Sequence, residues 1–426
     1  MPENTDAESR MGEQMNRREL REQILHQMDG RTSYVSDKDV YREIDKAILR
    51  SSHDGYGTLS EKEELRRQMF YSIRGFDVLE KYLGDSSISE IMVIGASRIF
   101  VEQNGKIRRI EEHFSEEGDV YRLIEQIVAP TNRMVNEACP IVDSRLPDGS
   151  RVHIVLPPVS LEGPVITIRK FLKGGMTIEK LLAFEEFPEK LTGILSALVK
   201  SRYNILISGA TNSGKSSLLN ALAEYIGKRE RVITIEDSAE LQLFHVENLV
   251  RLETRTANME GENEITMQDL IKASLRMRPD RIIVGEVRGA EAMSMLQALS
   301  TGHSGSVSSI HANSCRDALR RLETMVLMGM DMPLAAIQGL IASSVDILIH
   351  LGRLTTGKRK ILEICEIKDY SRAEYDIRTL FQYKAGQTES LEMTGKLFHT
   401  EKLKSYGQYE NYCEAVRLFC EEKREG

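Results

Sequence analysis

The sequence predicts an α/β fold in which a large C-terminal domain, built around a mostly parallel sheet, follows a smaller α/β domain and a helical lead-in. Short apolar runs at 203–208, 231–236 and 281–286 predict buried strands. They alternate with helical patterns, such as those at 215–226 and 270–277, and this alternation is typical of βαβ units around a parallel sheet.

Length and composition restrict the class of protein. At 426 residues, with 41% hydrophobic and 29% charged residues, the chain suits an ordinary soluble protein of two or three domains. The net charge of −8 argues against a general nucleic-acid binder, which needs a basic surface. The five cysteines are scattered without a CxxC pair, which favours reduced thiols over a disulfide framework or zinc ribbon. A polar N-terminus and the lack of a long apolar stretch predict a cytoplasmic protein that reaches membranes only through partners.

Changes in pattern along the chain set the expected domain boundaries. Apolar residues three or four apart predict helices near the start, one of them capped by Ser60. Strand-like runs with a hairpin signal at Asn104–Gly105 follow, and then Gly174 and Gly175 indicate a hinge. We expect a disordered tail at 1–16, a helical region at 17–84, an α/β domain at 85–172, a hinge at 173–178 and a C-terminal domain with an extension at 179–426.

The segment GATNSGKSS matches the phosphate-loop pattern GxxxxGK[ST] and lies between a predicted strand and a predicted helix, as that motif requires. Its glycines let the backbone bend so that N–H groups point at phosphate oxygens. Lys215 would hold the β and γ phosphates, and the Ser216 hydroxyl would ligate Mg²⁺. The alternative is a chance glycine-rich turn. The candidate nucleotide-binding residues are Gly209, Ala210, Thr211, Asn212, Ser213, Gly214, Lys215, Ser216 and Ser217.

Two of the predicted strands end in acidic residues, Glu236 and Glu286. Ligands bind at the carboxyl ends of the strands in an open parallel sheet, so both acids would reach the edge that carries the phosphate loop. Glu286 would hold Mg²⁺ through water, and Glu236 would polarise the attacking water. Either acid could instead be an ordinary polar residue at a strand end, and which one is the general base stays open.

Four segments, GATNSGKSS, ITIEDSAEL, RPDRIIVGEVRGAEA and TGHSGSVSSIHANS, resemble in this order the Walker A, Asp box, Walker B and His box of the type II/type IV secretion ATPase superfamily. Two upstream segments, RLPDGSRVHIVLPP and GPVITIRKF, resemble its Flp/tight-adherence pilus assembly branch. The resemblance covers about residues 91–367. It implies a RecA-like P-loop NTPase domain, ATP and Mg²⁺ as cofactors, and a homo-hexameric motor at the cytoplasmic face of the inner membrane, beneath a membrane platform protein.

Two histidines, His303 and His311, lie in a run of small and polar residues. No HExxH pattern, cysteine pair or third ligand accompanies them, so metal ligation is not expected. The resemblance implies that this segment lines the nucleotide site, with His311 near the γ-phosphate as a sensor of hydrolysis and His303 in support. Two incidental histidines in a polar strand are the alternative.

Three arginines upstream of the expected hinge are candidates for stabilising the transferred phosphoryl group. Arg145 and Arg151 flank the turn LPDGS, and Arg169 follows it in the next strand-like run. The resemblance implies that arginines of this region reach the γ-phosphate, within a subunit or across to its neighbour, and a guanidinium suits the charge of phosphoryl transfer. Each could instead be solvated or paired with a carboxylate. Second-choice candidates beside the Walker B strand are Arg276, Arg278 and Arg288.

The expected function is an ATP-hydrolysing motor coupled to pilus assembly or protein export. Within the family the alternatives are a type II secretion, conjugation or pilus-retraction ATPase, and the lack of a tetracysteine zinc module argues against the first. Outside it, a nucleic-acid translocase on the same core is the alternative, against which the acidic balance and the lack of an aromatic and basic stripe count. The third alternative is a scaffold that binds nucleotide without hydrolysing it, but such a protein would not need both acids at the strand ends.

Overall fold

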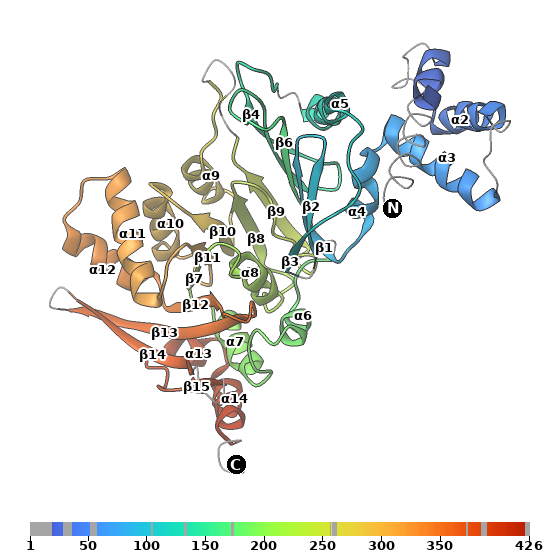
Figure 1. The fold of residues 1–426 in the computed structure, drawn as a ribbon. Coiled ribbons are helices and arrows are strands. Elements are labelled where there is room, and N and C mark those ends of the chain that lie inside the picture. Colours follow the sequence, from blue (N-terminus) through green and yellow to red (C-terminus); the bar gives the residue numbers. More distant parts are fainter. Residues whose placement is uncertain are drawn as a thin grey trace. The chain divides into compact units, whose positions relative to one another are not determined.

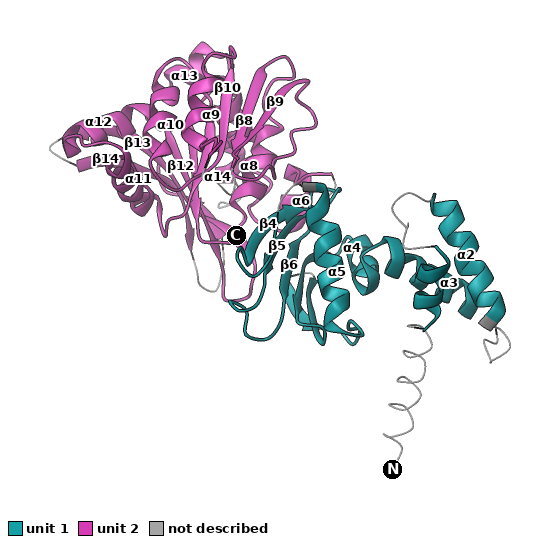
Figure 2. Ribbon diagram, turned by 90° about the horizontal axis from the view of Figure 1, so that it is seen from above, with its two compact units in different colours: residues 1–172 teal, residues 173–426 magenta. Residues whose placement is uncertain are grey.

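The computed structural model describes residues 19–28, 36–51, 58–103, 105–131, 134–171, 174–255, 257, 262–371, 374–384 and 390–421. The chain divides into two compact units, Met1–Leu172 and Lys173–Gly426, drawn in teal and magenta in Figure 2. The disordered tail expected at 1–16 lies outside the described residues, as do Asn104 of the expected hairpin turn and Lys173 of the expected hinge.

Unit 1 begins with helices that enclose a small apolar core of their own. Residues 19–27 form a helix, and α2 (Asp37–Ser51) and α3 (Leu59–Arg74) follow it. Apolar side chains three or four positions apart, such as Ile44 on α2 and Met69 on α3, are buried together in this core.

The start of α3 differs from the predicted one. Thr58, not Ser60, is the N-cap residue: its side chain accepts a hydrogen bond from the Glu61 backbone N–H, and the Glu61 carboxylate accepts one from the Thr58 backbone N–H. A threonine followed three residues later by a glutamate satisfies two backbone donors reciprocally, which explains why the helix begins there.

The rest of unit 1 is a six-stranded antiparallel sheet in the order β3-β2-β1-β6-β5-β4 (Figure 1). The helix α5 (Glu117–Val128) shares one apolar core with the sheet. The edge strand β3 is exposed at every position. The strands are β1 (Ile88–Ile94), β2 (Arg98–Gln103), β3 (Lys106–Arg109), β4 (Ile141–Arg145), β5 (Arg151–Val155) and β6 (Val165–Arg169), and the short helices are η3 (Asp77–Leu79), α4 (Glu80–Gly84) and η4 (Ala129–Thr131).

Unit 2 contains a nine-stranded sheet in the order β15-β14-β13-β12-β7-β11-β10-β8-β9. From β12 to β9 all neighbouring strands are parallel, whereas β12 to β15 are antiparallel, which includes the hairpin expected near the end of the chain. The strands are β7 (Ile205–Gly209), β8 (Arg231–Glu236), β9 (Asn248–Glu253), β10 (Arg281–Val287), β11 (Val307–Ile310), β12 (Ile347–Arg353), β13 (Arg359–Ser371), β14 (Glu374–Lys384) and β15 (Ser390–Met393).

Helices cover both faces of this sheet (Figure 1). Ile205 and Ile207 of β7 face one apolar core, and Leu206 between them faces the other, which is why the parallel strands read as continuous apolar runs. On the first face lie α6 (Ile178–Ala183), α7 (Leu191–Lys200), α8 (Lys215–Ala223), α13 (Glu401–Ser405) and α14 (Tyr409–Glu421). On the second lie α9 (Met267–Ser274), α10 (Glu291–Ser300), α11 (Cys315–Gly329) and α12 (Leu334–Ser344). The mixed α/β fold that the sequence predicts is therefore confirmed.

The described part of the expected hinge is bonded to unit 2. The Gly175 N–H donates to Gln242 Oε1 at 3.0 Å, and the Thr177 hydroxyl caps α6 by accepting from Lys180 N. Gly174 and Gly175 have φ of +93° and +60°, values that favour glycine. Among the described residues, no helix has both the length and the apolarity needed to cross a bilayer.

Candidate active site

The predicted phosphate loop connects β7 to α8 through a tight turn. A Cβ on Gly209 would lie 2.4 Å from Ser213 Oγ and 2.7 Å from the Leu351 carbonyl oxygen, so only glycine fits there. Gly214 caps α8 with a φ of +101°, a conformation that a side chain would strain. The loop therefore wraps around the N-terminus of α8, where backbone N–H groups and the helix dipole together favour an anion.

Lys215, the first residue of α8, is buried and points back over the loop. Its ammonium donates to the carbonyl oxygens of Gly209 and Ala210, both at 3.1 Å, and lies 3.2 Å from His311 Nδ1. Because a lysine ammonium can only donate, His311 Nδ1 is the acceptor and the ring proton is on Nε2. The structure thus brings together two predicted site residues that are distant in the sequence.

Glu286, near the carboxyl end of β10, meets the other side of the same imidazole. Its Oε1 lies 2.6 Å from His311 Nε2 and its Oε2 lies 3.0 Å from Arg288 Nη2. Burial lowers the pKa of His311, with Lys215 and Arg288 acting in the same direction and Glu286 against it, so the ring is neutral at pH 7. An ammonium, a neutral imidazole and a carboxylate thus form one chain of contacts beside the phosphate loop.

Arg288, a second-choice candidate from the sequence, contacts acidic residues at the ends of two strands, Glu286 and Asp237. Besides its contact with Glu286, its Nη1 lies 3.5 Å from Asp237 Oδ2, just after β8. The hydrogen bond to Glu286 raises the pKa of Arg288. The segment GEVRG gave no signal that this exposed arginine would contact carboxylates at the ends of both strands.

Glu236 is the last residue of β8, and its side chain is buried rather than exposed to solvent. Its Oε2 accepts hydrogen bonds from the backbone N–H groups of Glu240 at 2.7 Å and Leu241 at 3.0 Å. Its Oε1 is buried and has no hydrogen-bond partner among the described residues. Burial raises its pKa, against the two backbone hydrogen bonds. A fixed carboxylate with one free oxygen at this edge suits a group that accepts a hydrogen bond from water.

Glu186 and Arg359 flank the phosphate loop, although the sequence pattern did not predict them as site residues. A Cβ on Gly214 would lie 3.6 Å from Glu186 Oε1, and Arg359 Nε donates to the Asn212 carbonyl oxygen at 3.1 Å. Burial raises the pKa of Glu186 to about 7, which Arg359 and Lys360 oppose. Both residues come from segments without a motif, so nothing in the local pattern could have identified them.

The structure does not bring His303 to the phosphate loop. The strand β11 lies between the two histidines and runs parallel to β7, pairing Val307 with the start of β7 and Ile310 with its end. His311 therefore follows the carboxyl end of β11, whereas His303 precedes the amino end, at the opposite edge of the sheet. There, His303 Nδ1 is 3.3 Å from the Ala298 carbonyl oxygen, at the end of α10.

The three candidate arginines of unit 1 form a row across three neighbouring strands. Strand register pairs Arg145 of β4 with Arg151 of β5, and Arg151 with Arg169 of β6. Glu90 of β1 continues the row beside Arg169, and burial raises the pKa of this glutamate while Arg169 lowers it. Directly paired residues share one face of a sheet, so the row presents three guanidinium groups together.

Comparison with known proteins gives consistent results. The family described as "Type II/IV secretion system protein" matches residues 73–403. A protein of Mycobacterium tuberculosis whose name refers to conjugal transfer is 33% identical over 302 residues, covering 70% of this chain and 85% of that protein. The type IV secretion system protein PtlH of Bordetella pertussis is 31% identical over 312 residues, covering 67% and 92%. The solved structure of the ATPase DotB of Yersinia pseudotuberculosis shares the fold, with a TM-score of 0.50 at 17% identity over 68% of this chain and 78% of that one.

Proposed function

Since this chain belongs to the type II/IV secretion system protein family, we propose that it is an ATP-hydrolysing motor of a pilus-assembly or secretion machine. The observation that carries this proposal is the chain of contacts from Lys215 through His311 to Glu286 beside the phosphate loop. A loop that bound phosphate only for structural reasons would not need a neutral histidine between an ammonium and a strand-end carboxylate.

The residues around the loop fit ATP and Mg²⁺. The loop backbone and Lys215 would bind the phosphates, while Ser216 and Glu286 would hold Mg²⁺, Glu286 through water. The tight turn at Gly209 and the positive φ of Gly214 let the loop fold around the N-terminus of α8, where backbone N–H groups can bind a phosphate. Bound Mg²⁺ would neutralise charge on the phosphate oxygens during transfer.

Glu236 and His311 would have separate roles at the reacting end. The free Oε1 of Glu236 would accept a hydrogen bond from the attacking water and orient it. The raised pKa of Glu236 makes its carboxylate a stronger base than a solvated glutamate. His311 touches both Lys215 and Glu286, so loss of the γ-phosphate that Lys215 holds would change the contacts of His311. This makes His311 a sensor that links hydrolysis to movement.

The arginine row of unit 1 would complete the site in an assembled ring. In a cyclic homo-hexamer, head-to-tail interfaces allow one subunit to supply a group to its neighbour's site. Three adjacent guanidinium groups attract a polyphosphate, and Arg169 is the member at which we place the catalytic contribution, with Arg145 and Arg151 binding the nucleotide. His303, at the other edge of the sheet, has no part in this chain's own site under the proposal.

The finer proposal is assembly of a Flp/tight-adherence pilus, with the motor bound at the cytoplasmic face of the inner membrane to a platform protein. The segments RLPDGSRVHIVLPP and GPVITIRKF support this branch. The relatives named for conjugal transfer and type IV secretion favour a related machine, which is the second candidate. Deletion in the organism of origin separates the two, because loss of surface pili with intact conjugation supports the first and the reverse result the second.

The biochemical test measures phosphate release from ATP by the full chain. We expect hydrolysis that requires Mg²⁺, rises per subunit as rings form with increasing protein concentration, and does not respond to DNA. No hydrolysis at any protein concentration would contradict the proposal. Stimulation by DNA with a steep salt dependence would instead identify a nucleic-acid translocase.

A further inference from the structure

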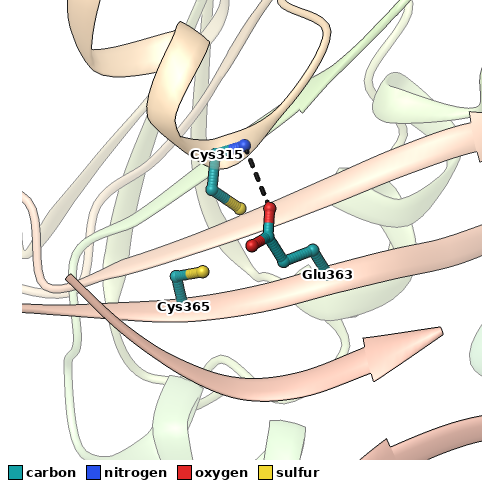
Figure 3. A group of neighbouring side chains, drawn as sticks. All are labelled: Cys315, Glu363 and Cys365. Carbon is teal, nitrogen blue, oxygen red and sulfur yellow. Dashed lines mark hydrogen bonds between the residues drawn. The ribbon is translucent and has the colours of Figure 1, made fainter.

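Three side chains of types that bind metals converge in unit 2, between the start of α11 and β13. Cys315 is the first residue of α11, and Glu363 and Cys365 are two residues apart on β13, so they share one face of that strand. The two sulfur atoms and a carboxylate oxygen all lie within 4.8 Å of one another. Figure 3 shows the three groups pointing toward a common point between α11 and β13.

The burial of this group distinguishes it from the other cysteines. Cys315 and Cys365 are each 1% exposed, whereas Cys139, Cys413 and Cys420 are exposed. The Cys315 backbone N–H donates to Glu363 Oε2 at 3.3 Å, which directs the carboxylate toward the sulfur atoms (Figure 3). The sequence could not indicate this group, because Cys315 lies about fifty residues from the other two.

Charge and chemistry point to a cation as the group that belongs here. No lysine or arginine among the described residues forms an ion pair with Glu363, which faces the buried His350 across the β12–β13 pair. A disulfide would join only the two sulfur atoms, whereas a bound cation would also use the carboxylate that lies beside them. Two thiolates and a carboxylate are instead a ligand set that zinc accepts, and sulfur ligands exclude the hard cations Mg²⁺ and Ca²⁺.

We propose that Cys315, Glu363 and Cys365 bind one zinc-like divalent cation. The site is separate from the Mg²⁺ site and does not rest on the proposed function. The cation ties the first turn of α11 to β13. Since Cys315 lies four residues after His311, the bound cation would also restrain the segment from which the histidine projects.

The test uses the full chain, stripped of metal with a chelator under reducing conditions and then titrated with Co²⁺ and Zn²⁺. We expect one ion per chain, a sulfur-to-cobalt charge-transfer absorption and a higher melting temperature on Zn²⁺ addition. Cys315→Ser and Cys365→Ser should each weaken binding by at least about tenfold and remove part of the charge-transfer absorption. Cys413→Ser, at an exposed cysteine, is the matched control and should bind as the unchanged chain does.

Glu363→Gln keeps the size of the side chain and both sulfur ligands, so it tests the site if a cysteine variant fails to fold. It should retain the sulfur-to-cobalt absorption but bind more weakly. Absence of Co²⁺ and Zn²⁺ binding by the reduced chain would overturn the proposal. Binding that survives in the Cys315→Ser/Cys365→Ser double variant would also overturn it, as would a Cys315–Cys365 disulfide in the protein as isolated.

Discussion

The phosphate-loop edge of unit 2 and the arginine row of unit 1 bring charged groups together in opposite ways. At the loop, Lys215, His311 and Glu286 come from three elements and hold one another through contacts of 2.6 to 3.2 Å. In the row, strand register places Arg145, Arg151 and Arg169 side by side, with Glu90 next to Arg169. Groups of opposite charge attract one another at the loop, whereas the row concentrates positive charge on one strip of a sheet. Under the proposed function, unit 2 would bind ATP and supply the acids for its hydrolysis, whereas Arg169 of unit 1 would add only to turnover, so mutations in the two units should have different effects.

The largest effect should come from Lys215→Ala, which removes the ammonium group from the phosphate-loop edge of unit 2. Removing the ammonium leaves the phosphates without their buried counter-charge, and we expect turnover to fall by about a hundredfold or more. Phosphate release and nucleotide binding would be measured on the folded variant. Lys200→Ala, an exposed lysine of the same unit, is the control. Full turnover by Lys215→Ala would show that the loop is not the site.

The next largest effect should come from Glu236 and Glu286 of unit 2, and it would distinguish the roles of these two acids. Glu236→Gln keeps the side-chain shape but cannot accept a proton, so it should bind ATP and hydrolyse it about a hundredfold more slowly. Glu286→Gln should weaken Mg²⁺ binding, and excess Mg²⁺ should restore part of its activity. Single-turnover phosphate release over a Mg²⁺ titration distinguishes the two. If turnover collapses only in Glu286→Gln and Mg²⁺ does not restore it, the two roles must be exchanged.

A smaller and partly recoverable effect should come from unit 1. Arg169→Ala should lower turnover by about tenfold or more while ATP still binds, because the phosphate loop is intact. Mixing it with Lys215→Ala should restore activity, since random mixing in a ring makes about a quarter of the interfaces complete.

Arg108→Ala, at an exposed arginine of the same sheet, is the matched control for Arg169→Ala. Unchanged turnover in Arg169→Ala would remove this arginine from the mechanism. Loss of activity without recovery in the mixture would mean that it acts within its own subunit.

The smallest effect concerns stability and tests the electrostatics of the loop. Burial raises the pKa of Glu186 to about 7 from a usual 4.5, so the folded chain binds the proton more tightly. The stability that this proton contributes is fully present below pH 4.5 and is lost as the pH rises through 7. Glu186→Gln should therefore gain stability relative to the unchanged chain by about 2 kcal/mol more at pH 8 than at pH 5.

Urea unfolding of unit 2 at the two pH values measures this difference. Glu185→Gln is the control. Glu185 is the exposed neighbour of Glu186, and its pairing with Lys358 lowers its own pKa. An equal difference between Glu186→Gln and the unchanged chain at both pH values would contradict the raised pKa.

The sequence predicts the parts of the site that depend on local pattern and strand direction. The phosphate loop needs only its own residues with a strand before and a helix after, and Glu236 and Glu286 meet because parallel strands end at one edge. Strand direction could also have predicted the position of His303, but the expectation for this histidine did not take it into account. The run VSSI between the two histidines forms β11, which is parallel to β7 and places His303 and His311 at opposite ends of the strands.

Other features depend on register and on packing between distant segments. The arginine row exists because β4, β5 and β6 pair in one register, which their separate patterns do not specify. Arg288 and Glu186 lie in segments without a motif, and their roles follow from where the sheet and its loops place them.

The edge strand β3 has a consequence for how copies of this chain can associate. Its four residues, Lys106–Arg109, are all exposed, and three of them are basic. An unpaired strand edge attracts a strand from another molecule, and positive charges along it oppose such pairing. If copies assemble into the proposed ring, these charges would discourage them from pairing through β3 into a continuous sheet. Contacts between copies at this edge would then be made by side chains, which can separate and re-form more readily than a shared sheet.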